Sequence, residues 1–344
     1  MRWFVNAALL TLVACGGEHN QHTGVDALLP DIGEPIDSLP PGCDYAEQRD
    51  ATNDDVPPSP GTPESTNLMV GSKTTICGAF QHTHFDGDIT VDVDGYTANV
   101  GSDGDFLVRI SGAGAEAIEL VGVDVYGGAA LDQLATSVTF YGDHGVGLVH
   151  LTAGTYEFLP FALNSAAITT TVDYKLELSS VALDTRCALI PSGGFTEAGD
   201  GGASTGNDMV AFPSGGPTAL TTASDNPEAT GINITSTSNN RLSGSAADVT
   251  TADRYEDKDT FAIATGAANE LTVRLGWSGA ANLDFYLFEA GTASPVAIAN
   301  GTAAGTETST FSLKPSSSYW LLVGAKPGTG LPATYSATLC GANY

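Results

Sequence analysis

The chain has 344 residues, enough for about two domains of ordinary size, and its 40 Asp and Glu residues outnumber its 12 Lys and Arg residues. The resulting formal charge of −28 argues against nucleic acids and makes anionic lipids poor partners, because both are bound through positive charge. The 41 glycines, the abundant Ser and Thr and the lack of long Leu/Glu/Lys-rich helical patterns favour an all-β fold of short strands and turns.

The first residues predict export and a lipid anchor. Arg2 precedes a short apolar run, too short to span a bilayer, that ends at Cys15. Leu12-Val13-Ala14-Cys15 resembles the bacterial lipobox, in which the cysteine is acylated and becomes the new N-terminus. The alternative is an ordinary signal peptide with a chance cysteine. Residues 1–14 are thus the expected signal peptide, and Cys15 the lipidated residue that makes a membrane one partner.

The residues after the cysteine bear on localisation. Gly16 stands where the inner-membrane retention signal would place Asp, so bacterial sorting rules favour the outer membrane or cell surface. Residues 15–42 are rich in Gly, His, Asn, Asp and Pro and lack hydrophobic periodicity, which predicts a flexible tether.

Four cysteines remain once Cys15 is lipidated. An even number in an oxidising compartment implies two disulfides, and the absence of a C-x-x-C pair argues against zinc. Their spacing alone leaves all three pairings open. These cysteines are Cys43, Cys77, Cys187 and Cys340.

The ectodomain contains a long internal repeat. Asp92-Val93-Asp94-Gly95-Tyr96 recurs as Asp257-Lys258-Asp259-Thr260-Phe261, and other matches have offsets between 160 and 166. A repeat of this length indicates two copies of a domain, predicted at residues 43–186 and 187–344, rather than a solenoid. The other matches are Glu64 with Glu228, Ile76 with Leu242, Leu107 with Thr272, Asp124 with Asp284, Tyr156 with Tyr319, and Tyr174 with Tyr335.

Both copies show apolar side chains at every second position. Leu271, Val273 and Leu275 alternate with polar or small residues in the second copy, as Phe106, Val108 and Ile110 do in the first. This pattern puts one face of each strand in a core and the other in water. The sequence therefore predicts two tandem antiparallel β-sandwich domains with jelly-roll-like connections.

Each copy resembles the bacterial pre-peptidase C-terminal domain, a small β-sandwich attached to many secreted proteases. The family pattern contains apolar-x-Gly, Asp-x-Asp-x-aromatic and, near its end, Gly-x-Tyr and a Tyr-x-apolar strand. The resemblance covers about residues 43–344, is weaker in the first copy, and fails between Gly127 and Gly147. The second copy carries Leu242-Ser243-Gly244, Asp257-Lys258-Asp259-Thr260-Phe261, Leu283-Asp284-Phe285-Tyr286-Leu287 and Tyr335-Ser336-Ala337, and the first carries Gly78, Asp92-Val93-Asp94-Gly95-Tyr96, Asp124, Gly154-Thr155-Tyr156 and Tyr174-Lys175-Leu176.

The repeat and the resemblance also suggest a disulfide pairing. Cys43 lies just ahead of the acidic lead-in of the first copy, and Cys187 precedes that of the second. We therefore expect Cys43–Cys77 and Cys187–Cys340, each within its own copy.

Calcium is the sharpest chemical hypothesis. Ca²⁺ prefers six to eight oxygen ligands, several of them carboxylates, and collagen-binding members of the family use a similar acidic linker for calcium. The alternative is a solvated loop whose Asp and Asn residues form turns. The candidate ligands are Glu47, Asp50, Asn53, Asp54, Asp92 and Asp94 in the first copy, and Glu197, Asp200, Asn207, Asp208, Asp257 and Asp259 in the second.

Other motifs give weaker evidence for a chemical function. His82 and His84 could share a strand face, but a third metal ligand is not apparent, and Asp143-His144 lacks the G-x-S-x-G elbow of a hydrolase. The sequence also has no H-E-x-x-H, Walker loop or dinucleotide fingerprint. Tyr319, Trp320 and Trp277 suggest either an aromatic platform or core residues.

The sequence therefore predicts a non-catalytic cell-surface lipoprotein, a binding or adhesion module for an extracellular polysaccharide or protein. This expectation rests on analogy with the fold family. A structural spacer and a hydrolase with an unrecognised active site are the alternatives.

Overall fold

The computed structural model describes residues 39–47, 63–80, 84–86, 89–112, 120–129, 131, 133–140, 144–164, 171–190, 193–197, 227–247, 257–290, 295–299, 305–328 and 330–343. Cys15, the predicted signal peptide and most of the predicted tether lie outside these residues. Among the described residues, no helix has both the length and the apolar character needed to cross a membrane.

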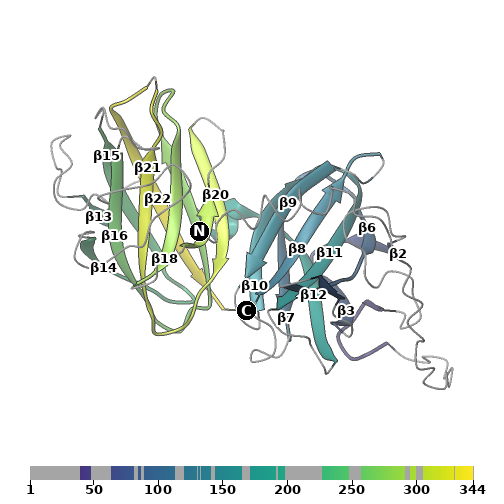
Figure 1. Ribbon diagram of the computed structural model, residues 1–344. Coiled ribbons are helices and arrows are strands. Elements are labelled where there is room, and N and C mark those ends of the chain that lie inside the picture. The colour runs from purple at the N-terminus through teal and green to yellow at the C-terminus, as the bar shows by residue number, and fades with distance from the viewer. Residues whose placement is uncertain are drawn as a thin grey trace, which may run out of the picture.

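The prediction of an all-β fold is confirmed. Strands form nearly all of the described regular structure, and α2 (Leu183–Arg186) is a single helical turn. The strands lie in four sheets, two built from residues 45–181 and two from residues 195–342, which we call the first and second halves (Figure 1).

The first half contains sheets A and B. Sheet A has the order β1-β3-β12-β7-β10, and sheet B has the order β2-β6-β11-β5-β4, with β8 also paired to β11 and β9 to β8. The strands are β1 (Tyr45–Ala46), β2 (Glu64–Val70), β3 (Thr74–Phe80), β4 (His84–Asp86), β5 (Ile89–Val93), β6 (Tyr96–Val100), β7 (Gly104–Ser111), β8 (Leu120–Gly127), β9 (Gln133–Phe140), β10 (His144–Leu151), β11 (Gly154–Asn164) and β12 (Val172–Val181).

The second half contains sheets C and D. Sheet C has the order β13-β15-β22-β17-β20, and sheet D has the order β14-β16-β21-β18-β19. In sheets A and C alike, a two-residue edge strand pairs in parallel and the following pairs are antiparallel. The strands are β13 (Phe195–Thr196), β14 (Glu228–Ile234), β15 (Asn239–Ala246), β16 (Asp257–Thr265), β17 (Glu270–Trp277), β18 (Leu283–Glu289), β19 (Pro295–Ala299), β20 (Thr306–Ser312), β21 (Ser318–Ala325) and β22 (Ala333–Ala342).

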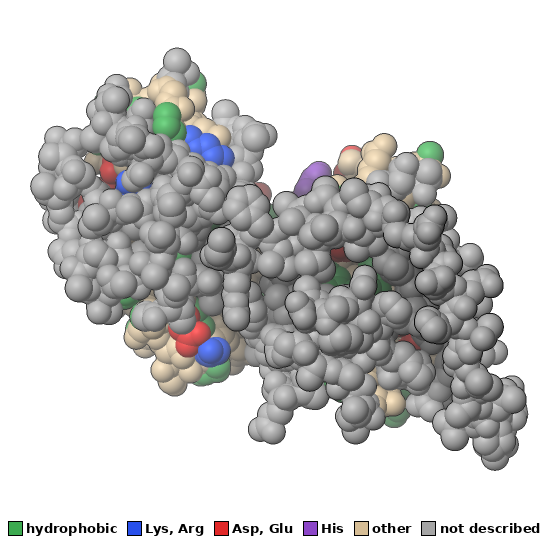
Figure 2. Space-filling model, viewed as in Figure 1, with side chains coloured by type: hydrophobic (Ala, Val, Ile, Leu, Met, Phe, Trp, Pro, Cys, Tyr) green, Lys and Arg blue, Asp and Glu red, His purple; other side chains and the backbone are tan. Residues whose placement is uncertain are grey.

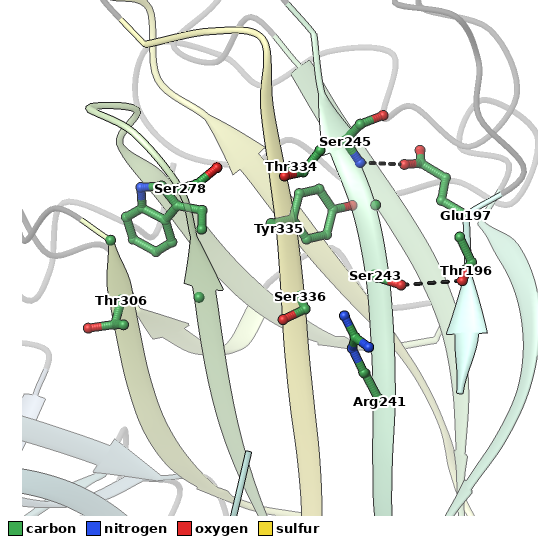
Figure 3. Close-up of a pocket in the computed structure, with 14 residues that line it drawn as sticks. Thr196, Glu197, Arg241, Ser243, Ser245, Ser278, Thr306, Thr334, Tyr335 and Ser336 are labelled. Carbon is green, nitrogen blue, oxygen red and sulfur yellow. Dashed lines mark hydrogen bonds between the residues drawn. The ribbon is translucent and has the colours of Figure 1, made fainter. Parts of the chain in front are cut away.

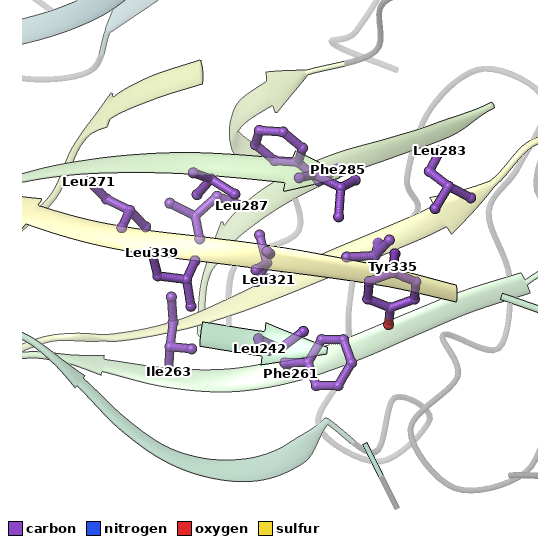
Figure 4. Packing of buried hydrophobic residues seen from close by; sticks show 14 of the residues in the cluster. Leu242, Phe261, Ile263, Leu271, Leu283, Phe285, Leu287, Leu321, Tyr335 and Leu339 are labelled. Carbon is purple, nitrogen blue, oxygen red and sulfur yellow. The ribbon is translucent and has the colours of Figure 1, made fainter. Parts of the chain in front are cut away.

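Each half encloses its own hydrophobic core between its two sheets. In the second half, Leu339 of sheet C and Phe285 of sheet D are both fully buried in one cluster (Figure 4). In the first half, Val108 of sheet A and Phe158 of sheet B belong to a separate cluster. The alternation of apolar and polar residues along the strands produces this arrangement, because successive side chains point to opposite sheet faces.

Both disulfides have the expected pairing. Cys43 is bonded to Cys77 on β3, and Cys187 is bonded to Cys340 on β22, with Cα–Cα distances of 5.8 and 5.5 Å. The two bridges lie at different positions in the strand registers of sheets A and C. Cys77 faces Lys175 of the neighbouring strand β12, whereas Cys340 faces Thr272 and Asn239 of its neighbours β17 and β15.

The two halves meet where β10 lies beside β20, the outermost strands of sheets A and C (Figure 1). The outer faces of these sheets contribute a buried ion-pair network to this junction. Arg109 of β7 donates to Glu270 of β17 at 2.6 and 3.1 Å, and also to Glu177 of β12 at 3.1 Å. Arg186 of α2 donates to the same Glu270 at 2.5 Å. Ion pairs thus link both sheets and the connecting helix.

Candidate functional site

A buried group of carboxyl and phenol side chains lies at one end of the core of the second half. Glu197 directly follows β13, Asp259 lies on β16 and Tyr335 on β22, so both sheets contribute. The Tyr335 hydroxyl donates to Asp259 Oδ2 at 2.7 Å, and the backbone N–H of Ser245 donates to Glu197 Oε2 at 2.9 Å (Figure 3). All three side chains are at least nine-tenths buried, which removes them from bulk water.

Burial determines the protonation of this group. Desolvation raises the pKa of Asp259 well above its ordinary value, and the neighbouring carboxylates Asp257 and Glu197 raise it further. Desolvation likewise raises the pKa of Tyr335, and the charges of Asp259 and Glu197 add to that effect. A protonated Asp259 carboxyl can therefore donate to Glu197 while it accepts a hydrogen bond from Tyr335.

The first half contains a similar group. The Tyr174 hydroxyl donates to Asp94 Oδ2 and lies 2.8 Å from the Tyr96 hydroxyl. Glu47, directly after β1, accepts a hydrogen bond from the backbone N–H of Ala79 at 2.8 Å. Desolvation raises the pKa of Tyr174, and the charge of Asp94 raises it further.

A glycine lies against the tyrosine in each group. A Cβ on Gly244 would lie 2.3 Å from the Tyr335 hydroxyl oxygen, and a Cβ on Gly78 would lie 2.4 Å from that of Tyr174. Neither glycine has a positive φ, so the requirement is for space and not for backbone freedom. The apolar-x-Gly motif in the sequence therefore makes room for a buried phenol.

Several predicted calcium ligands can be placed. Glu47, Asp94, Glu197, Asp257 and Asp259 are buried, and Asp257 accepts a hydrogen bond from the N–H of Ala247. The described ranges contain no group of three or more His, Cys, Asp or Glu side chains arranged to hold a metal. Asp92 lies on β5 with its side chain undescribed, and Asp50, Asn53, Asp54, Asp200, Asn207 and Asp208 lie outside the described residues, so calcium stays a prediction.

The outer face of sheet C has a shallow hollow of about 680 Å³ (Figure 3). Tyr335, Ala337 and Leu339 of β22 point into the core, so Ser336 and Thr334 face the opposite side. The residues lining the hollow are Thr196, Glu197, Arg241, Ser243, Gly244, Ser245, Gly276, Trp277, Ser278, Gly305, Thr306, Thr334, Tyr335 and Ser336.

Hydroxyl groups dominate this hollow, and none of its lining residues is a histidine or an accessible carboxylate. Arg241 contributes a positive charge beside Ser243 and also lines a second hollow of about 360 Å³ next to Asn240. Glu197 and Trp277 were sequence candidates for other roles, but the sequence did not predict the hollow that they line. Its signal in the sequence is weak, because small hydroxyl residues at alternate positions, such as Thr334 and Ser336, are common on any solvated strand face.

The remaining sequence candidates do not form an exposed site. Tyr319, Trp320 and Trp277 are 2, 6 and 9% exposed, which agrees with the interpretation as buried residues and not with an exposed aromatic platform, although Trp277 also lines the hollow. His82 and Asp143 lie outside the described residues, and His84 and His144 lie on β4 and β10 with undescribed side chains.

The described side chains that are visible in Figure 2 form small, separate groups. The exposed large apolar residues among those described are Leu39, Met69, Leu134 and Leu189, which come from separate parts of the chain. Of the described features, the hollow on sheet C therefore remains the clearest candidate for ligand contact.

Comparison with known proteins gives fold similarity only. No family model matches the chain, and no curated protein matches it. The pre-peptidase C-terminal domain of a collagenase from Bacillus anthracis is 20% identical, with a TM-score of 0.25 over 35% of this chain and 99% of that one. A β-glucosidase from Paenibacillus barengoltzii is 14% identical, with a TM-score of 0.19 over 38% of this chain and 13% of that one. The PBSX exported protein XepA is 11% identical, with a TM-score of 0.22 over 76% of this chain and 85% of that one. No functional conclusion follows from these similarities.

Proposed function

We propose that this chain is a non-catalytic lipoprotein of the bacterial cell surface that binds an extracellular polysaccharide or protein through the hollow on sheet C. The observation that carries the proposal is the open, hydroxyl-lined hollow itself. Concave sites with a few convergent polar groups are the usual places for ligands on folded domains.

A non-catalytic role is supported by the chemistry of the lining. Ser243 donates to the backbone carbonyl of Phe195 at 3.3 Å, and the hollow holds no histidine that could act as its base. Glu197 is 8% exposed and binds the N–H of Ser245. A nucleophile with an adjacent base is therefore missing from this set of lining residues.

The two halves are proposed to be copies of one domain, with residues 43–186 as the first and 187–344 as the second. Matching registers support this. Tyr174 is opposite Gly78 as Tyr335 is opposite Gly244, and Tyr96 is opposite Phe158 as Phe261 is opposite Leu321. The offsets of 161 for the tyrosines and 165 for Tyr96 and Phe261 agree with the sequence repeat.

Export and anchoring remain part of the proposal. The lipobox-like Leu12-Val13-Ala14-Cys15 supports a lipid anchor, and Gly16 supports the outer membrane or cell surface. Two disulfides agree with an oxidising compartment. Mass spectrometry of the mature N-terminus tests this directly, since acylated Cys15 is expected and an unmodified residue after a different cleavage site would refute the anchor.

Calcium is proposed at the acidic group that starts at Glu197, and by the repeat at Glu47. The support is chemical, because oxygen-rich carboxylate groups suit a hard cation. A calorimetric titration of the chelator-treated protein with CaCl₂ tests it. Saturable heat supports calcium binding, and a flat titration refutes it.

The binding function itself is tested with a screen of glycans and matrix proteins on the full chain in mild detergent. Wild type and Gly276→Val are compared, because valine would narrow the hollow and cover part of its floor. A ligand that binds wild type and loses affinity for the variant supports the proposal. Binding by neither protein favours the structural spacer, and release of a cleaved product favours a hydrolase.

A further inference from the structure

We propose that the hollow on sheet C binds an uncharged saccharide chain. This deepens the proposed function and rests on it. The hollow is the end of the outer face of sheet C that the first half leaves open, since the junction with the first half is built on Glu270 at the other end of β17.

The lining matches the chemistry of sugar hydroxyls. Side-chain hydroxyls both donate and accept hydrogen bonds, and so do those of a saccharide. Those of Ser243, Thr334 and Ser336 lie on the neighbouring strands β15 and β22, so they form a flat array (Figure 3). An apolar ligand would take the Thr334 and Ser336 hydroxyls out of water without offering them a hydrogen bond, which costs free energy.

An extended peptide fits the hollow less well. Strands β15, β22 and β17 form its floor; β22 and β17 are paired along both edges, whereas the outer edge of β15 is paired with β13 only at Leu242 and Ser243. A peptide therefore cannot join the sheet in the middle of this floor. A peptide can join a sheet only at an unpaired edge, where backbone N–H and C=O groups are available. A ligand that brings its own hydroxyls meets no such requirement.

Charge excludes polyanionic polymers. The chain has a formal charge of −28, so a polymer of acidic sugars is repelled by the molecule as a whole. Arg241 is the one basic residue among the lining residues, and its guanidinium can also donate to neutral sugar hydroxyls. Glu197 is buried, so it contributes no accessible carboxylate for a cationic ligand.

The equivalent face of sheet A is built differently. Gly276 lies between Ser336 and Thr306 in sheet C, whereas Ser111 lies between Lys175 and His144 in sheet A. Cys77, in a disulfide, stands at the register position of Ser243. The Lys175 ammonium donates to the Pro41 carbonyl, so residues ahead of β1 lie over this part of sheet A.

Gly276 makes the hollow testable. A Cβ at this position would have no atom closer than 3.9 Å, so a side chain fits there without displacing its neighbours. Its φ is not in the left-handed region, and β17 is a strand, where valine is favoured. Gly276→Val therefore places an apolar side chain on the floor of the hollow and narrows it, and Ser111→Val is the matched control in the first half.

The experiment measures binding of neutral glucose hexasaccharides with β-1,4, β-1,3 and α-1,4 linkages to the full chain in mild detergent, by saturation-transfer NMR and calorimetry. A hexagalacturonate serves as the charged counterpart. We expect one or more neutral hexasaccharides to bind with a Kd on the order of 1 mM, because the floor has no exposed aromatic ring for stacking. Gly276→Val should weaken binding about 10-fold or more, and Ser111→Val should leave it unchanged.

Three results would refute the proposal that the ligand is an uncharged saccharide. They are equal or tighter binding of the hexagalacturonate, equal loss in both valine variants, and no binding of any neutral hexasaccharide by wild type. Thermal unfolding of both variants shows that each is folded. A matrix protein that binds wild type but not Gly276→Val, with no saccharide bound, would uphold the proposed binding function and refute only its ligand class.

Discussion

Arg109 and Glu270 are 161 residues apart in sequence, yet the Arg109 Nε lies 2.6 Å from Glu270 Oε1. One residue belongs to sheet A and the other to sheet C, and both side chains are almost completely buried. Burial raises the pKa of Glu270, but the hydrogen bonds and charges of Arg109 and Arg186 outweigh it, so the net pKa is lowered. Glu270 is therefore an ionised carboxylate that joins the two halves.

Removing one partner of this pair should be costly. Arg109→Met leaves Glu270 with Arg186 alone and is expected to destabilise the protein by about 1.5–3 kcal/mol, because buried Glu270 loses one of its two counterions and the hydrogen bonds from Arg109. Denaturant unfolding monitored by fluorescence measures the loss. Asp184→Asn is the control, because Asp184 is 91% exposed where it pairs with Arg274, and its loss should cost at most about 1 kcal/mol. If the two variants lost equal amounts of stability, the Arg109–Glu270 pair would not stabilise the junction.

The glycine beside each buried tyrosine gives a second prediction. Gly244→Ala is expected to destabilise the second half by about 1–3 kcal/mol, because the new methyl group would overlap the Tyr335 hydroxyl. Gly276→Ala, on the same sheet but with open space at its Cβ, should be neutral or slightly stabilising. Paired thermal and urea unfolding curves measure both. A neutral Gly244→Ala would show that Tyr335 can move aside freely.

Asp259 predicts an unusual pH dependence. Its folded pKa is raised above 3.8, so the stability it contributes is fully present below pH 3.8 and is lost as pH rises through the folded pKa. The free energy of unfolding of wild type minus that of Asp259→Asn should therefore fall with rising pH, by at most about 1.4 kcal/mol per pH unit. Urea titrations from pH 4 to pH 8 measure this difference in calcium-free buffer. A difference that rises with pH would mean that Asp259 is stabilised as a carboxylate.

The two disulfides should differ in their effect. The pairs are separated by 34 and 153 residues, so the chain-entropy relation gives about 4 kcal/mol for Cys43–Cys77 and about 5 kcal/mol for Cys187–Cys340. Double substitution to alanine at each pair, followed by denaturant unfolding, tests the order. The Cys187/Cys340 variant should lose more, and the reverse order would show that the reduced unfolded chain keeps structure.

The all-β fold and its cysteine pairing could be predicted from the sequence. Alternation such as Leu271-x-Val273-x-Leu275 has one physical meaning, a strand with one buried face, and each predicted core position in this run is buried. The pairing Cys187–Cys340 followed from the repeat, although its place on the sheet has no counterpart in the first half.

The junction and the hollow could not be predicted in this way. Arg109 and Glu270 carry no local pattern that links them, since their contact depends on how two separately folded sheets meet. The hollow depends on the lack of a side chain at Gly276. In a sequence, a glycine within a strand pattern equally suggests a bulge or a close backbone approach. Alternation identifies which side chains leave the core, but it does not show what covers them.

The Cys187–Cys340 bridge turns residues 187–340 into a covalent ring. A protease that cuts any single peptide bond inside this ring opens the circle but releases no fragment, so both pieces stay attached to the rest of the chain. Two cuts are needed before any part of the hollow can diffuse away. Where secreted proteases are present, the bridge would therefore keep the second half attached to the chain after a single cut.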